Sequence, residues 1–409
     1  MKRIIILCDG TWNRSDSKTP TNVVKIARAI TPTSPEGIKQ IPLYFEGVGS
    51  GRGATRFARA SDIVLGGAFG VGILGNMEAM LRALAFAYEP GDEVFIFGFS
   101  RGAYTARSFA GLLRCTGIPD RQKLYEIPAA IRRYQAKRSA ENHPDHDESH
   151  CHRANISPNV ATSQTEVEWR MKRGHEPPFL LRLKYIGVWD TVAALGIPMF
   201  LPIATLINGT RFKFHDARLT SLSEAARHAV AIDERRRTFP QELWKKVGQL
   251  DFTDHGDTGH YRQVRFAGDH GSVGGGGKVV GLSNIAMRWI LEGASEQGLH
   301  LDAKQLKAWE DQEKPSDALF NSGKPPGLLH RLMGWGYADR TGPSNVGQVH
   351  HETIRRFKQK PSEARIPLYR PPPLAHLEDE LISLLDEKFR PDQTIMVADR
   401  TAPQEDNIG

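Results

Sequence analysis

Cysteine is scarce in this chain of 409 residues, and its scarcity restricts how the protein can be stabilised. The three cysteines, Cys8, Cys115 and Cys151, are odd in number and include no CxxC pair. A disulfide framework in a secreted protein normally shows an even count at characteristic spacings. We therefore expect a protein of a reducing compartment.

Long apolar runs are also lacking. No stretch reaches the length that a bilayer-spanning helix requires. The run Ile4–Leu7 near the amino terminus is too short for the hydrophobic region of a signal peptide, and it is typical of a buried first strand. These features predict a cytoplasmic protein. Action outside the cell would need a secretion system that does not read a signal peptide.

A strong excess of one charge sign is missing too. The formal net charge is +7, from 54 Lys and Arg against 47 Asp and Glu, and the charges are spread along the chain. Such a surface permits peripheral contact with an anionic membrane, but it is equally explained as ordinary solvated surface. No nucleic-acid-binding module is recognisable, so we expect no nucleic-acid partner.

The most informative stretch runs from Asp92 to Gly111, DEVFIFGFSRGAYTARSFAG. Val94–Phe97 is apolar and β-favouring, as in a strand that is buried on both faces. A helix-prone run, Ala103–Leu113, follows after a few residues. The stretch therefore predicts a strand, a sharp turn and a helix.

The turn between this strand and this helix has the pattern Gly-x-Ser-x-Gly, with Gly98 and Gly102 on either side of Ser100. In a nucleophile elbow the serine has a strained backbone, and side chains two residues away would clash across the turn. An ordinary turn that happens to contain a serine is the alternative. The flanking strand and helix favour the elbow, with Phe99 lining the site and the Arg101 N–H as an oxyanion-hole donor.

Two other patterns suggest ligands but lack the right context. Gly70, Gly72 and Gly75 form a GxGxxG, yet no strand directly precedes them, so we interpret 47–75 as a flexible loop over the site. Residues 143–152 are rich in His, Asp and Glu, but no spacing matches a structural zinc site. We expect neither a cofactor nor a metal.

Several separate motifs resemble one known family. GFSRGAYTAR is similar to the signature of the DUF2235 family, the α/β-hydrolase-like domain that includes the type VI secretion phospholipase effectors of the Tle1 group. Four further stretches match in the family's order: CDGTWN from Cys8, GVWDTVAALG from Gly187, AIDERRRTF from Ala231 and FAGDHGSVGGG from Phe266. Together they cover about residues 1–300, and LYRPPPL from Leu368 is a weaker match.

The resemblance implies an α/β-hydrolase-like fold, with a mostly parallel central sheet flanked by helices. It implies that Asp190, which directly follows a predicted strand at 179–189, belongs to a catalytic triad. It also implies that the loop after Cys8 lies beside Ser100 and supplies an oxyanion-hole N–H from Gly10 or Thr11. Alternatively, that loop is a turn in which Asp9 satisfies local backbone donors.

His270 stands out among the fifteen histidines by its position. It follows a predicted strand at 261–267 on a glycine-rich turn, where an imidazole can reach the sheet edge as a general base must. Ser100, Asp190 and His270 also follow the order Ser…Asp…His of α/β-hydrolases. The family usually has an acid or amide two places after the histidine, whereas this chain has Ser272, so neighbouring Asp269 is a candidate to orient the imidazole.

These residues predict a serine hydrolase that cleaves carboxylic esters. The resemblance implies that the substrates are fatty-acyl esters of glycerophospholipids, cleaved as by a phospholipase A. A soluble carboxylesterase or polyester hydrolase is one alternative, and an inactive hydrolase-fold scaffold is another. A secretion-system or immunity partner is compatible with the resemblance.

We expect residues 1–297 to form the catalytic core and 298–409 an extension that packs on it or covers the site entrance. Within the core, 119–178 is polar and is interpreted as an irregular insertion and a candidate lid. Leu222–Ile232 is rich in alanine and predicts a helix. The charges that follow it, from Asp233 to Arg237, match a family motif and predict a salt-bridged corner.

Overall fold

A single parallel sheet organises the protein. The computed structural model describes residues 1–11, 13–47, 67–136, 139, 143–192, 219–245, 247–249, 259–320, 336–359 and 368–384. Six strands form the sheet in the order β2-β1-β3-β6-β7-β8, and every neighbouring pair is parallel. They are β1 (Lys2–Cys8), β2 (Lys39–Phe45), β3 (Glu93–Phe99), β6 (Arg182–Trp189), β7 (Ser223–Ala231) and β8 (Tyr261–Phe266).

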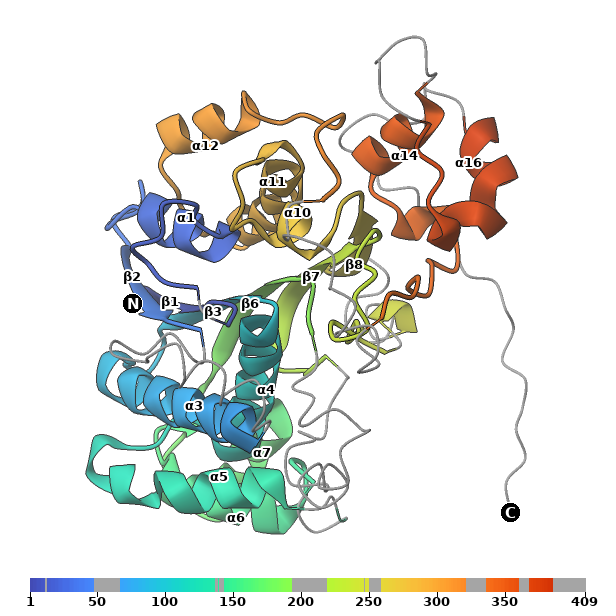
Figure 1. Ribbon diagram of the computed structural model, residues 1–409. Coiled ribbons are helices and arrows are strands. Elements are labelled where there is room, and N and C mark those ends of the chain that lie inside the picture. Colours follow the sequence, from blue (N-terminus) through green and yellow to red (C-terminus); the bar gives the residue numbers. More distant parts are fainter. Residues whose placement is uncertain are drawn as a thin grey trace, which may run out of the picture.

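Helices cover both faces of this sheet, which is why its central strands β3 and β6 are buried along most of their length. Figure 1 shows α1 (Asn22–Ala29), α11 (Gly281–Glu296) and α12 (Ala303–Glu310) on one side. On the other side are α3 (Gly67–Ala87) and α4 (Arg101–Thr116). Alternate residues of β1 enter the two cores: Ile4 and Ile6 pack on the α3–α4 side, and Ile5 and Leu7 on the α1–α11 side. The predicted α/β-hydrolase-like sheet is thus confirmed.

The alanine-rich segment 222–232 is a strand rather than the helix we predicted. As β7 it lies between β6 and β8 and is buried along almost its whole length. Alanine has a high helix propensity, but its small side chain also fits between a sheet and a closely packed helix. Tertiary packing therefore overrides the local propensity.

Thr21 caps α1, because its side chain accepts a hydrogen bond from Val24 N–H. Two smaller predictions also need correction. The predicted strand 179–189 divides into β5 (Phe179–Leu180), which pairs with β4 (Val160–Ala161), and β6. The predicted loop 47–75 is helical from Gly67, so the GxGxxG glycines lie in α3; 48–66 lie outside the described residues.

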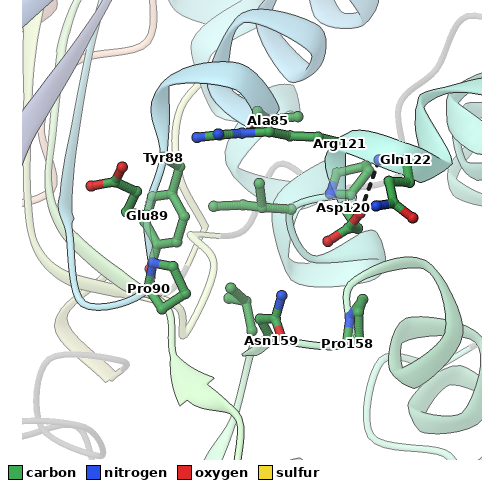
Figure 2. A pocket seen from close by; sticks show the side chains of 12 residues that line it. Ala85, Tyr88, Glu89, Pro90, Asp120, Arg121, Gln122, Pro158 and Asn159 are labelled. Atoms are coloured by element: carbon green, nitrogen blue, oxygen red, sulfur yellow. Dashed lines mark hydrogen bonds between the residues drawn. The ribbon is translucent and has the colours of Figure 1, made fainter.

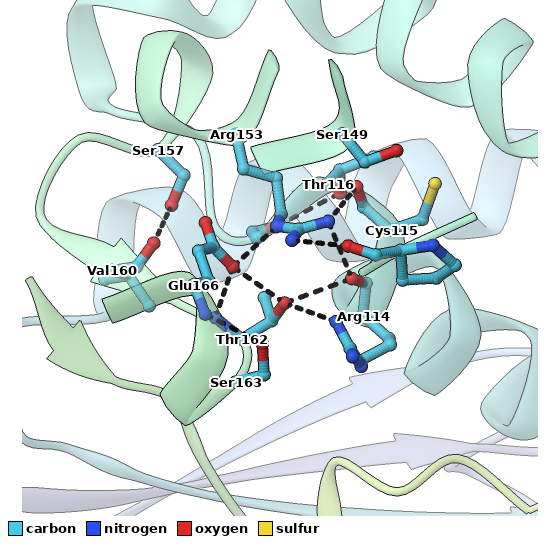
Figure 3. Close-up of polar contacts among 12 residues, drawn as sticks. Arg114, Cys115, Thr116, Ser149, Arg153, Ser157, Val160, Thr162, Ser163 and Glu166 are labelled. Atoms are coloured by element: carbon cyan, nitrogen blue, oxygen red, sulfur yellow. Dashed lines mark hydrogen bonds and ion pairs between the residues drawn. The ribbon is translucent and has the colours of Figure 1, made fainter. Parts of the chain in front are cut away.

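The insertion 119–178 is more regular than its polar composition suggested. It contains η1 (Arg121–Glu126), α5 (Ile127–Gln135), α6 (Asp147–Ile156) and α7 (Gln164–Lys172). Figure 3 shows how it is held: the buried Glu166 carboxylate accepts hydrogen bonds from Arg153 and Thr162. Glu166 also pairs with Arg170. Arg114 near the end of α4 joins the network through Thr162. At 1.5 Å per residue, Arg114 lies about 20 Å along α4 from Ser100, so these contacts anchor the insertion far from that serine.

The carboxyl-terminal part packs beside β8 (Figure 1). It contains η3 (Val346–Gln348), α14 (His351–Lys358), η4 (Pro372–Leu377) and α16 (Glu378–Ser383). Apolar residues of these elements form a third core with Ile232 and Ala267 of the sheet's edge. The boundary at residue 297 stays a prediction. None of the described helices is both long enough and apolar enough to span a membrane.

Candidate active site

Ser100 lies where β3 ends and α4 begins, at the carboxyl edge of the sheet. Its backbone has φ 59° and ψ −123°, a conformation that L-residues rarely adopt. A Cβ on Gly98 would lie 2.6 Å from the Gly102 carbonyl oxygen, and one on Gly102 would lie 2.3 Å from the Cys8 and Asp9 carbonyl oxygens. The two glycines are therefore needed for the turn, as expected for an elbow.

Asp190 occupies the corresponding edge position after β6. Its backbone N–H donates to Ala229 O at 2.7 Å, and its φ is 36°. Among the described residues, Ser100 and Asp190 are the two non-glycine residues with a positive φ. Backbone strain of this kind concentrates at functional sites, where the surrounding structure enforces it.

His270 is the first residue of the short helix α10 (His270–Gly274) and lies against both of these positions. Its Nδ1 is 2.6 Å from Asp190 Oδ2. Its ring stacks on Phe99, with ring centres 4.5 Å apart, and meets the edge of Phe239 at 4.9 Å. Since Phe99 directly precedes Ser100, the stacking holds the imidazole beside the serine turn. A proton on Nδ1 directed at the carboxylate leaves Nε2 as a proton acceptor.

A second side chain, that of Arg340, binds the Asp190 carboxylate. Arg340 donates through Nη1 to Oδ1 at 2.6 Å and through Nη2 to Oδ2 at 3.1 Å, and Ala231 N–H donates to Oδ1 at 3.0 Å. Burial would raise the pKa of Asp190, but the Arg340 charge and the hydrogen bond to His270 outweigh burial and hold that pKa well below its ordinary value. Asp190 is thus a carboxylate across the working pH range.

The loop after β1 lies next to Ser100, as the family resemblance implied. A Cβ on Gly10 would lie 3.1 Å from Ser100 Cβ. The Gly10 N–H, however, donates to Asp9 Oδ1 at 2.7 Å, so Asp9 engages one of the two expected donors. Thr11 approaches Arg101, whose Nη1 donates to Thr11 Oγ1 at 3.0 Å. Thr11 is therefore the better candidate for an oxyanion-hole donor from this loop.

Asp9 itself serves the loop. Its Oδ2 accepts hydrogen bonds from the hydroxyls of Thr21 and Tyr44, each at 2.8 Å. Burial raises the pKa of Asp9 to about 6, although these hydrogen bonds oppose the shift. The Asp9 side chain therefore accepts hydrogen bonds from donors of its own loop and its surroundings, in agreement with the alternative interpretation of this loop as a turn.

The charged motif after β7 supports the histidine segment. Asp233 accepts hydrogen bonds from Gly268 N–H at 2.6 Å and from the Tyr369 hydroxyl at 2.9 Å. Glu234 accepts from His270 N–H at 3.3 Å and pairs with Arg236. The predicted salt-bridged corner therefore exists, and it fixes the backbone that carries the imidazole.

The residues beside His270 have local roles. Asp269 caps α10 by accepting from Ser272 N–H at 2.9 Å, and the Ser272 hydroxyl donates to Leu319 O at 3.0 Å. The Nδ1 atom of the imidazole contacts Asp190. Ser272, which stands where the family usually has an acid or amide, anchors α10 and does not bind the ring.

Two residues near Asp190 were missed from the sequence. His228 lies beside the backbone that follows Asp190: its Nε2 is 3.2 Å from Thr191 N. Its Nδ1 is 2.9 Å from Gln263 Oε1. Burial lowers the pKa of His228 to about 3, so this ring is neutral. Reading 222–232 as a strand would have placed His228 beside the site. Arg340 has no local sequence signal that distinguishes it from other arginines.

The remaining ligand-like features lie elsewhere. Figure 2 shows a cavity of about 360 Å³ between the end of α3 and η1, bordered by Tyr88, Glu89 and Arg121. Glu89 precedes β3, so this cavity is at the sheet edge opposite Ser100. In the part of the chain that the structure describes, no three His, Cys, Asp or Glu side chains are arranged to hold a metal ion.

Comparison with known families gives a match over most of the chain. Residues 2–293 match the family described as "T6SS, Phospholipase effector Tle1-like, catalytic domain". The match includes Ser100, Asp190 and His270, and it ends before Arg340.

Individual relatives are more distant. The uncharacterized protein YEL023C of Saccharomyces cerevisiae is 25% identical over 252 residues, which are 59% of this chain and 32% of that protein. An uncharacterized protein from Pseudomonas aeruginosa has a similar solved structure, with a TM-score of 0.40 and 15% identity over 76% of this chain and 48% of the other. The Tle1 effector was solved bound to the VgrG spike of the type 6 secretion system. Its structure has a TM-score of 0.34 and 18% sequence identity, and the match covers 67% of this chain and 51% of that one. The chain thus spans about a third of the curated relative and half of each structural one.

Proposed function

Because the chain belongs to the family of Tle1-like phospholipase effector catalytic domains, we propose that it is a serine hydrolase acting on fatty-acyl esters of glycerophospholipids. The observation that carries this proposal is the Asp190–His270 hydrogen bond beside a serine on a strained strand-to-helix turn. This arrangement supports nucleophilic acyl transfer.

In the proposed mechanism, His270 Nε2 accepts the proton of Ser100 Oγ as Oγ attacks the ester carbonyl carbon. Asp190 holds the imidazole through Nδ1 and stabilises the imidazolium that forms. His270 then gives the proton to the leaving alcohol oxygen, here that of a lysophospholipid, and an acyl-serine remains. Water, deprotonated by the same imidazole, attacks the acyl carbon. The bond to Ser100 Oγ then breaks, the imidazole returns the proton to Oγ, and the fatty acid is released.

The negative oxygen of each tetrahedral intermediate needs donors that are in place beforehand. The backbone N–H groups of Arg101 and Thr11 are proposed for this role, since α4 begins at Arg101 and Thr11 follows the Gly10 backbone that touches the Ser100 turn. Removing one such donor typically costs about 3 kcal/mol of barrier.

The test is fatty-acid release from vesicles of phosphatidylethanolamine and phosphatidylglycerol. We expect release by the wild type and none by Ser100→Ala, because the turn accommodates the smaller side chain while the nucleophile is gone. Ser108→Ala, which changes another buried serine of α4, is the matched control. Lipid hydrolysis by Ser100→Ala would overturn the mechanism.

A short-chain ester and a fluorophosphonate label separate the alternatives. Ser100-dependent cleavage of the short ester without lipid release would indicate a soluble carboxylesterase or polyester hydrolase. Absence of both activities and of labelling would indicate a scaffold. Membership of this family also suggests export by a type VI secretion system, with a spike protein and an immunity protein as proposed partners.

A further inference from the structure

The carboxyl-terminal extension reaches directly into the candidate active site through Arg340. Its guanidinium binds both oxygens of Asp190, and it also donates to Ala231 O at 3.0 Å and Phe239 O at 2.9 Å. Its side chain is only 7% exposed, and that of Asp190 is fully buried. The Arg340 side chain thus connects the Asp190 carboxylate to the end of β7 at Ala231 and to Phe239, whose ring packs on His270.

The backbone around Arg340 is fixed by the segment after β7. Arg237 N–H donates to Gly336 O at 3.0 Å, and Ala338 N–H donates to Arg235 O at 2.8 Å. Asp339 adds an exposed ion pair with Arg235 at 2.8 Å. The guanidinium therefore approaches Asp190 from a segment that is itself held in place.

The position of Arg340 in the sequence makes these contacts unexpected. The family match ends at residue 293, so a carboxylate inside the matched region takes its bidentate partner from outside it. A fork of two parallel N–H donors fixes a carboxylate in orientation as well as in position. Asp190 also has a positive φ, a strained backbone conformation that the surrounding contacts must maintain.

We propose that Arg340 is a positioning residue for the hydrolase reaction: it holds the Asp190 carboxylate in the orientation that aligns the His270 imidazole, and its charge offsets that of Asp190. This inference rests on the proposed function. It assigns part of the active site to the carboxyl-terminal extension.

The charges around Asp190 determine what the loss of Arg340 would do. The titratable and charged groups that face Asp190, His270 or Arg340 come from every neighbouring element: His270 of α10, His228 of β7, Glu234 and Arg236 after β7, Arg265 of β8 and Arg340 itself. Without Arg340, the carboxylate charge would act on the imidazole with less compensation.

The experiment measures the rate at which a fluorophosphonate labels the full-length protein, as a function of pH, in wild type, Arg340→Met and Arg340→Lys. We expect Arg340→Met to label about 10- to 100-fold more slowly, because the imidazole loses its alignment. Its pH profile should also differ from that of wild type, because Asp190 has lost the neighbouring charge of Arg340. Arg340→Lys keeps the charge but not the fork, so we expect an intermediate rate and a pH profile close to that of wild type.

Asp339→Asn is the matched control, since it removes the neighbouring exposed ion pair of the same segment and leaves Asp190 untouched. We expect it to label as wild type does. An Arg340→Met protein with the wild-type rate and profile would overturn the inference, as would a loss that Asp339→Asn reproduces. If Arg340→Met does not fold, an Arg340→Lys protein that labels at the wild-type rate would overturn it instead. A wild type that does not label at all would reject the proposed function itself.

Discussion

Among the described residues, two of the buried carboxylates that bind arginine can be compared, one in the candidate active site and one in the insertion. Asp190 binds Arg340, and Glu166 binds Arg153 and Arg170. Both side chains are fully buried. In each case burial would raise the pKa, and the neighbouring arginine charge outweighs burial and lowers the pKa below its ordinary value.

The two sites differ in their backbone and in their third partner. Glu166 lies in the first turn of α7, capped by Ser163, and its remaining partner is Thr162. Asp190 has a positive φ, and its remaining side-chain partner is an imidazole. Burial and arginine pairing alone therefore do not identify a catalytic carboxylate. Strain and a titratable partner distinguish the one that we assign to chemistry from the one that stabilises the fold.

The largest difference should appear in activity. Asp190→Asn is expected to lower kcat/KM by about 10⁴-fold, because an amide at this position favours the wrong imidazole tautomer. Steady-state hydrolysis of a short ester measures the effect. Glu166→Gln is the comparison, and per folded molecule it should match wild type; a comparable loss of activity in Glu166→Gln would abolish the distinction.

Stability should show the opposite dependence. Glu166→Gln leaves Arg153 and Arg170 with an uncompensated buried charge, so the free energy of unfolding should fall by about 3–5 kcal/mol. Urea unfolding measures it. Glu168→Gln alters an exposed glutamate of the same helix and should change stability by less than about 0.5 kcal/mol. Equal effects of the two substitutions would show that the buried network does not hold the insertion.

Acid should weaken this network in a predictable direction. The pKa of Glu166 is lowered in the folded protein, so the unfolded chain binds its proton first and stability falls as pH drops below the ordinary glutamate range. Each such carboxylate contributes a slope of up to about 1.4 kcal/mol per pH unit. Unfolding free energies measured from pH 5 to pH 2 should therefore decline less steeply in Glu166→Gln than in wild type. Parallel curves would mean that Glu166 does not titrate on unfolding.

The smallest expected effect concerns backbone strain. Ser100→Gly relieves a positive φ, so this inactive variant should be more stable than wild type by about 1 kcal/mol. Ser163→Gly removes the cap of α7, where no strain exists, and should lose a few tenths of a kcal/mol. Thermal unfolding of both variants checks the signs. Loss of stability in Ser100→Gly beyond that in Ser163→Gly would contradict strain at the serine turn.

The sequence predicted those parts of the site that depend on local geometry. The elbow at Ser100 needed only a buried strand, two glycines and a helix, all of which are contiguous in the chain. Asp190 was placed by the family resemblance and by its position directly after a strand, and His270 by its position on a turn shortly after another strand. Parallel strands end at the same edge of the sheet. Their catalytic roles stay predictions.

What could not be predicted depended on tertiary contacts. β7 has the composition of a helix, and only its position between two strands makes it extended. Helices α6 and α7 of the insertion contain few apolar residues, because a buried ion-pair network replaces part of an apolar core there. Arg340 lies 150 residues from its partner, and no spacing or composition connects the two.

Because Asp190 and Arg340 are 150 residues apart, they are synthesised at different times. Synthesis proceeds at about 5–20 residues per second, so Arg340 is added roughly 8–30 s after Asp190. The Arg340–Asp190 pair cannot form during that interval, although β1, β3 and β6 have already been made. A nascent chain would therefore carry its nucleophile before it has the contact proposed to align the base. For the proposed lipid hydrolase, this delay would lower activity next to the membranes of the cell that makes it.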